Sequence, residues 1–303
     1  MTDRLVSPLA SGGAGHEFEY DVATLLLSRM LRGAHLPVGS ELPVARIGLQ
    51  QRNSGFRFDD IVAFADPAGT AASVQIQVKL GIRPTASDPD FIEVMQAAHA
   101  VCLDHTDEIA NGSMKLALAA PGPVKGLTDL TTLTDMARAH VQHETYVELL
   151  RPLVTKAELR NRYDHVTEAV SRATGIRQEG AIDEAAHRIL SALHIWQVDL
   201  GRDWRAELDG LTPVASGSGT TPADLLQHLR GLAGEFGPRG GVVDAGHLRV
   251  TLHDRFGIRL AEPGEEPRPP PGITVNNYGS APSFVAGGDQ NFHGGMSFNE
   301  QSK

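Results

Sequence analysis

Two strand-like segments joined by a tight turn constrain the fold of this chain most strongly. Residues 55–65 end in an apolar run, and residues 73–80 read Ser-Val-Gln-Ile-Gln-Val-Lys-Leu, which alternates with a period of two. The sequence Asp-Pro-Ala-Gly at 66–69 has the composition of a turn. Because the two segments are close in the chain and the connection is short, they predict a β-hairpin.

The elements expected on either side of this hairpin complete a mixed domain. From His16 to Gly33, apolar residues recur at helical spacing, with Glu19 among the acidic residues of the first turn, where carboxylates favour the helix dipole. The other expected elements are a strand within 43–51, a helix over 91–103 and a buried strand over 114–120. The order αβββαβ predicts an α+β domain over residues 15–125, after a flexible N-terminus of residues 1–14.

The remaining sequence divides into a helical part, a linker and a tail. Amphipathic spacing predicts an all-α domain over residues 126–260, and its segment 222–260 fits either a small winged-helix-like end or a helical hairpin. Residues 261–272 are rich in proline and are expected to form an extended linker. Residues 273–303 are rich in Gly, Asn and Ser, which favours a disordered, low-complexity tail.

Composition limits the classes of protein to which the chain belongs. Its 303 residues hold 27 Lys and Arg against 37 Asp and Glu, so the formal net charge is -10. A global basic footprint for nucleic acid is therefore absent, and DNA binding requires a local basic surface. Cys102 is the one cysteine, which excludes a disulfide framework and a cysteine-rich zinc module. No signal peptide or membrane-length apolar segment is found, so we expect a cytoplasmic protein that does not bind membranes.

The strongest cluster of polar residues lies on the predicted hairpin. Asp60 is in phase with the strand that follows it, and Gln77 and Lys79 share one face of the next strand because side chains alternate with a period of two. Apolar residues of that second strand point to the other face, into the core. The hairpin is therefore expected to bring Asp60, Gln77 and Lys79 together at one edge of the sheet.

These residue types suit the hydrolysis of a phosphodiester. The reaction uses a divalent cation, Mg²⁺ or Mn²⁺, held mainly by oxygen ligands. The Asp60 carboxylate and the Gln77 amide oxygen are candidate ligands, and Glu19 adds a second carboxylate. Lys79 is a candidate to orient or deprotonate the attacking water and to stabilise charge on the phosphate.

The same residues resemble a known superfamily. A helix Glu, then Asp60, then Gln77-x-Lys79 on the neighbouring strand is similar to the PD-(D/E)XK, restriction-endonuclease-like superfamily, and more narrowly to the double-stranded-DNA nuclease domain of bacterial anti-phage effectors. The resemblance covers about residues 14–125 and implies an αβββαβ core and Mg²⁺-dependent cleavage of DNA. Gln77 stands where the superfamily usually has an acidic residue, which either weakens metal affinity or shifts metal binding toward Glu19 and Asp59.

Each of these residues also has a structural interpretation. The Asp60, Gln77 and Lys79 side chains fit the exposed polar face of an ordinary hairpin, and Glu19 fits a partner of the helix dipole. For Asp59, a solvated residue on the opposite strand face is the simpler interpretation. Other residues fit either a functional or a surface role: Gln96 and His99 near the phosphate, and Arg46, Arg52, Arg57 and Arg83 as a basic rim for DNA. Cys102, flanked by apolar residues, is interpreted as a core thiol.

The tail carries a second functional signal. Residues 273–299 combine β-prone residues, Asn, Gln and spaced aromatics with little charge, a composition that favours cross-β stacking. They resemble the C-terminal amyloid signalling motifs of bacterial immune effectors. The resemblance implies recruitment by an upstream sensor protein with a matching motif, and homo-oligomerisation on activation.

Two functional hypotheses follow, with a weaker third. The first is a metal-dependent DNA endonuclease that acts as an effector in bacterial anti-phage defence. The second is a non-catalytic adaptor with a degenerate nuclease fold that signals through its tail. The third is a nuclease directed at RNA, because the same catalytic face would serve both polymers. Asp60 and Lys79 are both present, which favours an enzyme.

Overall fold

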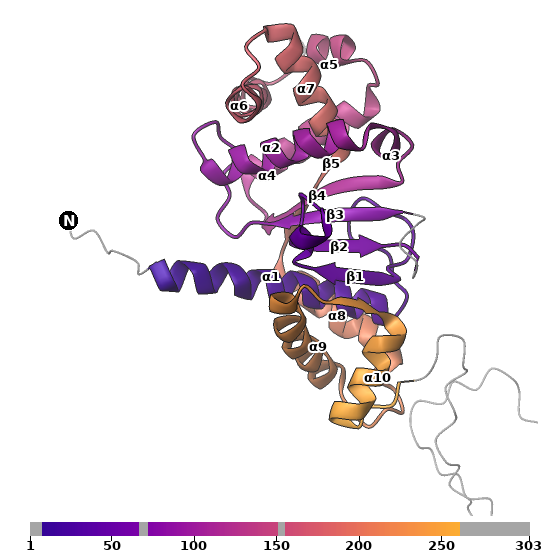
Figure 1. Ribbon diagram of the computed structural model, residues 1–303. Helices are drawn as coiled ribbons and strands as arrows, with labels where there is room; N and C mark the ends of the chain where they lie inside the picture. Colours follow the sequence, from indigo (N-terminus) through magenta and orange to yellow (C-terminus); the bar gives the residue numbers. More distant parts are fainter. Residues whose placement is uncertain (1–7, 67–71, 151–154, 261–303) are drawn as a thin grey trace, which may run out of the picture. The chain divides into compact units, whose positions relative to one another are not determined.

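A six-stranded sheet with helices on both faces forms the described part of the chain (Figure 1). The computed structural model describes residues 8–66, 72–150 and 155–260, and the side chains of these residues except 8–14, 52 and 53. The strands are β1 (Arg46–Leu49), β2 (Ile61–Phe64), β3 (Ser73–Val78), β4 (Met114–Pro121), β5 (Leu193–Val198) and β6 (Val242–Asp244). Their order across the sheet is β5-β4-β3-β2-β1-β6.

The helices surround this sheet. They are α1 (Pro8–Leu31), α2 (Pro89–Asp104), α3 (Thr106–Ala110), α4 (Lys125–Ala139), α5 (His143–Leu149), α6 (Ala157–Thr174), α7 (Glu179–Ala192), α8 (Leu200–Ala215), α9 (Pro222–Phe236) and α10 (Ala245–Phe256). Two short 3-10 segments, η1 (Gln51–Ser54) and η2 (Gly237–Arg239), precede β2 and β6. The α+β class predicted from the sequence is confirmed, and so is the order αβββαβ of its first elements, α3 and η1 aside.

The predicted hairpin is present and fixes the register at the centre of the sheet. β2 and β3 are antiparallel, with Ile61 opposite Ile76, and β1 is antiparallel to β2, with Leu49 opposite Ile61. β4 then joins β3 in parallel. The turn at 67–71 lies outside the described residues, as do the predicted linker at 261–272 and the tail at 273–303.

Two apolar cores lie on the two faces of the sheet. Ile47, Ile61 and Ile76 pack with α1, α8, α9 and α10 on one face. Leu116, Leu118 and the helices α2, α4, α5, α6 and α7 form the core on the other. Alternation along each strand sends neighbouring side chains to opposite cores, so the period of two that predicted the strands also builds both layers. Polar side chains lie at the ends of the strands.

The N-terminal part differs from the expectation of a flexible segment over residues 1–14. The helix α1 begins at Pro8 and runs through the glycines at positions 12 and 13. Each helical glycine costs about 1 kcal/mol relative to alanine, which a long helix tolerates. Glu19 therefore lies in the middle of α1 and not in its first turn, so the helix dipole does not explain its position.

The expectation of an all-α domain over residues 126–260 is wrong at two elements. β5 pairs in parallel with β4, and β6 pairs with β1, so both edge strands of the sheet come from this range. β5 begins directly after α7, with no glycine or proline between them, which hides the change of structure in the sequence. Residues 222–260 do not form a separate winged-helix end, because β6 adds to the main sheet. The described residues form a single compact unit.

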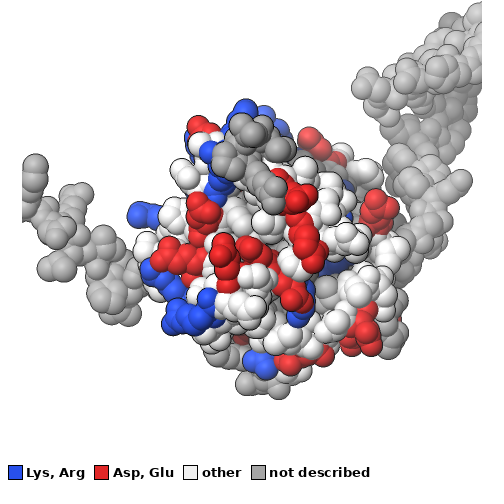
Figure 2. Space-filling view, turned by 90° about the horizontal axis from the view of Figure 1, so that it is seen from above, with Lys and Arg blue, Asp and Glu red and all other residues white. Residues whose placement is uncertain are grey.

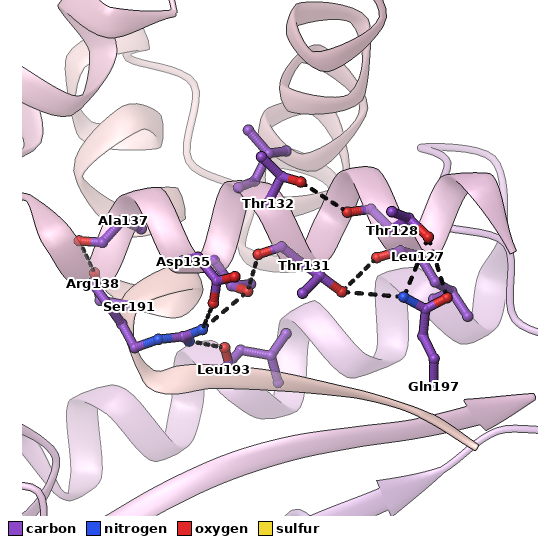
Figure 3. Close-up of polar contacts among 12 residues, drawn as sticks. Leu127, Thr128, Thr131, Thr132, Asp135, Ala137, Arg138, Ser191, Leu193 and Gln197 are labelled. Atoms are coloured by element: carbon purple, nitrogen blue, oxygen red, sulfur yellow. Dashed lines mark hydrogen bonds and ion pairs between the residues drawn. The ribbon is translucent and has the colours of Figure 1, made fainter. Parts of the chain in front are cut away.

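Polar contacts tie β5 to the helix α4 (Figure 3). Arg138 on α4 donates from Nη1 to the carbonyl of Leu193, the first residue of β5, at 2.6 Å, and Ser191 at the end of α7 donates to the Ala137 carbonyl at 3.3 Å. At the other end of the strand, Gln197 Nε2 donates to Thr131 Oγ1 at 3.4 Å. These contacts make β5 an integral strand of the sheet. In the described part of the chain, no helix has the length and apolar character needed to cross a membrane.

Candidate functional site

Asp60 and Gln77 lie side by side at one end of the sheet. The β2–β3 register places them opposite each other, one step beyond the Ile61 and Ile76 pair. Gln77 Nε2 donates to Asp60 Oδ2 at 2.6 Å, and the Val78 backbone N–H donates to the same oxygen at 2.7 Å. The contact between Asp60 and Gln77 was predicted from the sequence, and the structure places the two residues together.

The Asp60 carboxyl is held in an environment that disfavours its charged form. Burial, with smaller contributions from Glu19 and Asp59, raises its pKa to about 7, although the Val78 hydrogen bond and the nearby Lys79 cation act in the opposite direction. Carboxylates that lie close enough to raise the pKa of each other repel one another in their charged forms, and a bound cation relieves that repulsion. Three acidic side chains, Asp60, Glu19 and Asp59, therefore lie near one another at this end of the sheet, where burial partly removes water.

Lys79 follows β3 and lies in the same place, but its ammonium group pairs with α2. Its Nζ is 2.7 Å from Glu93 Oε2 and 3.6 Å from Asp90 Oδ1. Burial would lower the pKa of Lys79, but Glu93, Asp90 and Asp60 outweigh burial and raise it. Lys79 is therefore a fixed cation in this arrangement, which favours stabilisation of phosphate charge over a role as a base.

Glu19 reaches the site from α1, on the other side of the strand ends. It is buried, and its Oε1 accepts a hydrogen bond from Gln50 Nε2 at 2.5 Å. Its Oε2 lies 3.5 Å from His16 Nδ1. Burial raises the pKa of Glu19 in spite of these partners, and the Asp59 charge adds to the effect. The predicted second carboxylate is thus close enough to Asp60 to shift its pKa.

The donor set fits a hard divalent cation that keeps several water ligands. Asp60 and Glu19 supply carboxylate oxygens, and Gln77 supplies an amide oxygen once its side-chain amide is turned by a half-rotation. Among the described residues, no group of three or more His, Cys, Asp and Glu is placed to hold a metal ion. Two carboxylates and a neutral oxygen are nevertheless the kind of site in which Mg²⁺ binds, because Mg²⁺ retains much of its water.

A cavity of about 520 Å³ opens beside Gln77, between α2 and the segment before β2. Asp59, Glu93 and the exposed Gln96 line it. Asp59, which is partly exposed, therefore borders this cavity. His99 does not line it; burial, with a smaller contribution from Arg188 on α7, lowers the His99 pKa. Of the two α2 residues considered from the sequence, the structure places only Gln96 near the site.

The arginines considered as a basic rim are scattered. Arg46 stacks on the Phe64 ring at 4.3 Å, and both residues lie at the end of the β1–β2 pair that is opposite Asp60. Arg57 lines the cavity beside Gln77 and pairs with Asp104 at 3.0 Å. Arg83 lies in the connection from β3 to α2, and the side chain of Arg52 is outside the described residues. Arg57 and Arg83 are thus the members of the rim that lie on the site's side of the sheet.

Two residues that contact the site, Gln50 and Glu93, were not predicted from the sequence. Gln50 was not singled out because its contact with Glu19 depends on an unusual backbone conformation. Glu93 was not singled out either, because its pairing with Lys79 depends on how the helix that follows Lys79 crosses the sheet. Cys102, in contrast, is buried with its pKa raised to about 11 by burial, which fits the predicted core thiol.

Among known proteins, only solved structures match the chain. No family model and no curated protein matches the chain. The solved structures that match include three of the Acinetobacter baumannii Cap4 SAVED/CARF-domain containing receptor, with the cyclic trinucleotide 3'3'3'-cAAA, with 2'3'3'-cAAA, and on its own. Each aligns with 10% identity and a TM-score of 0.40 over 79% of this chain. The chain spans 44–46% of the length of these receptor chains.

Proposed function

We propose that this protein is a metal-dependent DNA endonuclease that acts as an effector in bacterial anti-phage defence. The observation that carries the proposal is the pairing of Asp60 with Gln77 on adjacent strands, with Glu19 and Lys79 beside them. The defence role is supported by the resemblance of these residues, and of the tail, to bacterial effectors.

Each residue has a distinct task in this proposal. Asp60, Glu19 and Gln77 hold Mg²⁺ or Mn²⁺, which supplies positive charge to polarise the scissile phosphate and to activate water. The Val78 N–H fixes the direction of the Asp60 carboxylate, which leaves the Gln77 amide to turn its oxygen toward the cation. Lys79, kept protonated beside Glu93, contributes a cation that stabilises the charge that develops on the phosphate.

The proposed substrate is double-stranded DNA. The net charge of -10 means that binding relies on local cations, of which Arg57 and Arg83 lie on the site's side of the sheet. Recruitment by a sensor through residues 273–299, with self-association on activation, is part of the same proposal. That segment lies outside the described residues, so its role rests on its composition alone.

A plasmid cleavage assay with matched lysine variants tests the proposal. The full-length chain is incubated with supercoiled DNA and Mg²⁺ or Mn²⁺, both free and clustered by fusion to an oligomeric carrier. We expect cleavage by the wild type and a loss of about 100-fold or more in Lys79→Ala, because a charge-stabilising group is removed. Lys115→Ala is the control, since Lys115 lies near the start of β4, at the other end of the sheet.

Two results would contradict the proposal. Equal cleavage by the wild type and Lys79→Ala would place the activity elsewhere or in a contaminant. No cleavage by the wild type, free or clustered, would favour the adaptor. A parallel RNA substrate that is cut faster than DNA would change the substrate class and leave the site assignment intact.

A further inference from the structure

Gln50 has a backbone conformation that stands out in the described part of the chain. Its φ is 51°, and among the described residues it is the one non-glycine residue with a positive φ. Residues other than Gly, Asn and Asp avoid this left-handed region because the Cβ atom crowds the backbone. Such conformations persist where the surroundings enforce them, and they cluster at functional sites.

The surroundings of Gln50 enforce this conformation from several directions. Its N–H donates to the Asp60 carbonyl at 2.9 Å, which continues the β1–β2 ladder by one residue. The next residue, Gln51, is buried and donates from Nε2 to the carbonyls of Leu49 and Gly240. Gly240 itself has a φ of 62°, and a Cβ atom there would lie 3.5 Å from the Gln50 carbonyl oxygen.

The turn at Gln50 coincides with a contact to the candidate metal site. Alternation along β1 sends Ile47 and Leu49 to the α1 side of the sheet, so a regular strand would send the next side chain away from α1. Gln50 leaves the regular strand geometry, and its Nε2 instead donates to Glu19 on α1. The strained backbone and the hydrogen bond to a buried carboxylate therefore belong together.

A neutral donor at this point has a specific consequence. An arginine or lysine bonded to Glu19 would cancel its charge, but an amide fixes the carboxylate and leaves the negative charge for a cation. His16, the other partner, is 3.5 Å away from the second oxygen and largely exposed, so it holds Glu19 less firmly. Partners of this kind orient the residues that coordinate metal ions.

We propose that Gln50 is a positioning residue that holds the Glu19 carboxylate toward the metal site, and that its left-handed backbone serves this contact. The inference rests on the proposed metal-dependent function. A purely structural role, in which Gln50 only ends β1, makes a different prediction for a glycine in its place. Glycine adopts a positive φ without strain, so it would preserve the turn and remove only the amide.

The test compares Gln50→Gly with a matched control. Gln227→Gly removes an exposed glutamine from the interior of α9, where glycine is unfavourable. For each full-length variant, Mn²⁺ affinity is measured by calorimetry and the unfolding midpoint is measured without metal. Gln50→Asn is a second variant, because Asn also tolerates a left-handed backbone but its amide is one methylene short of Glu19.

The expected results separate the two roles. Gln50→Gly keeps or raises the midpoint and weakens Mn²⁺ binding by about 10- to 100-fold, the usual loss when a partner of a metal ligand is removed. Gln50→Asn weakens binding similarly. Gln227→Gly lowers the midpoint by about 2–4 °C and leaves binding within about twofold, because Gln227 lines a different cavity from the one beside Gln77.

Two outcomes would overturn the inference, and they differ from each other. If the wild type binds Mn²⁺ and Gln50→Gly binds it equally well, the positioning role is wrong but the proposed site stands. If neither the wild type nor any variant binds Mn²⁺, the metal site itself is wrong, and the role of Gln50 falls with it.

Discussion

At the scale of single residues, Glu207 carries a buried charge between α8 and α1. Its Oε2 accepts hydrogen bonds from Ser28 Oγ and from Arg32 Nη2, each at 2.8 Å, and Arg29 Nε lies 2.8 Å from its Oε1. Gly210 on α8 leaves room for this arrangement, because a Cβ atom there would lie 2.7 Å from Arg32 Cζ. The Glu207 charge is thus paired with two arginines of α1, so the contact between α8 and α1 depends on it.

We expect Glu207→Ala to lower the free energy of unfolding by about 3 kcal/mol, because two arginines lose a buried counter-charge. Chemical denaturation of the full chain measures the change. The control is Glu184→Ala, which breaks an exposed ion pair with Arg188 on α7 and should change stability by about 0.5 kcal/mol or less. A loss below about 1 kcal/mol for Glu207→Ala would show that the pairing does not stabilise the contact between α8 and α1.

The sequence could predict some residues of the site and not others, for a physical reason. Asp60, Gln77 and Lys79 were predicted because strand alternation and a short hairpin connection determine which side chains meet. Gln50 was not predicted, because its contact with Glu19 depends on a positive φ that tertiary packing imposes on a residue type that avoids it. The pairing of Lys79 with Glu93 likewise depends on how α2 crosses the sheet, which no local pattern records.

At the scale of elements, the edge strands connect the two halves of the sequence. β5 and β6 lie at opposite edges of the sheet, and both come from the range expected to be a separate helical domain. The sequence predicted the strands that begin and end in turns but missed β5, which follows a helix without a break, and β6, which has three residues. Short or unpunctuated strands leave too few residues for a periodic pattern to appear.

A fragment of residues 1–125 is therefore expected not to fold on its own. It lacks β5, β6 and the helices α4 to α10, so most partners of both apolar cores are absent. Residues 1–260 keep all the described elements and should unfold in one cooperative thermal transition. Circular dichroism of the two fragments makes the comparison. A cooperative transition in the shorter fragment would mean that the nuclease-like part is an independent domain after all.

At the scale of the whole described unit, charge restricts where a polyanion can bind. Figure 2 looks down on the end of the molecule that carries α5, α6 and α7, and carboxylates predominate across the centre of this face. The exposed acidic residues of these helices are Glu144, Glu148, Glu158, Asp164, Glu168, Glu179 and Glu184. Such a face repels DNA, so we expect DNA to approach the ends of β2 and β3 from another side.

The most direct test of the account is a metal add-back measurement on full-length protein. The wild type and Asp60→Asn are stripped with EDTA, and plasmid cleavage is followed as Mg²⁺ is restored. Asn keeps the size of Asp60 and removes the charge that would hold the cation. We expect no cleavage in EDTA, recovery with Mg²⁺ in the wild type, and a rate at least about 100-fold lower in Asp60→Asn. Cleavage by the stripped wild type, or equal recovery in Asp60→Asn, would contradict it.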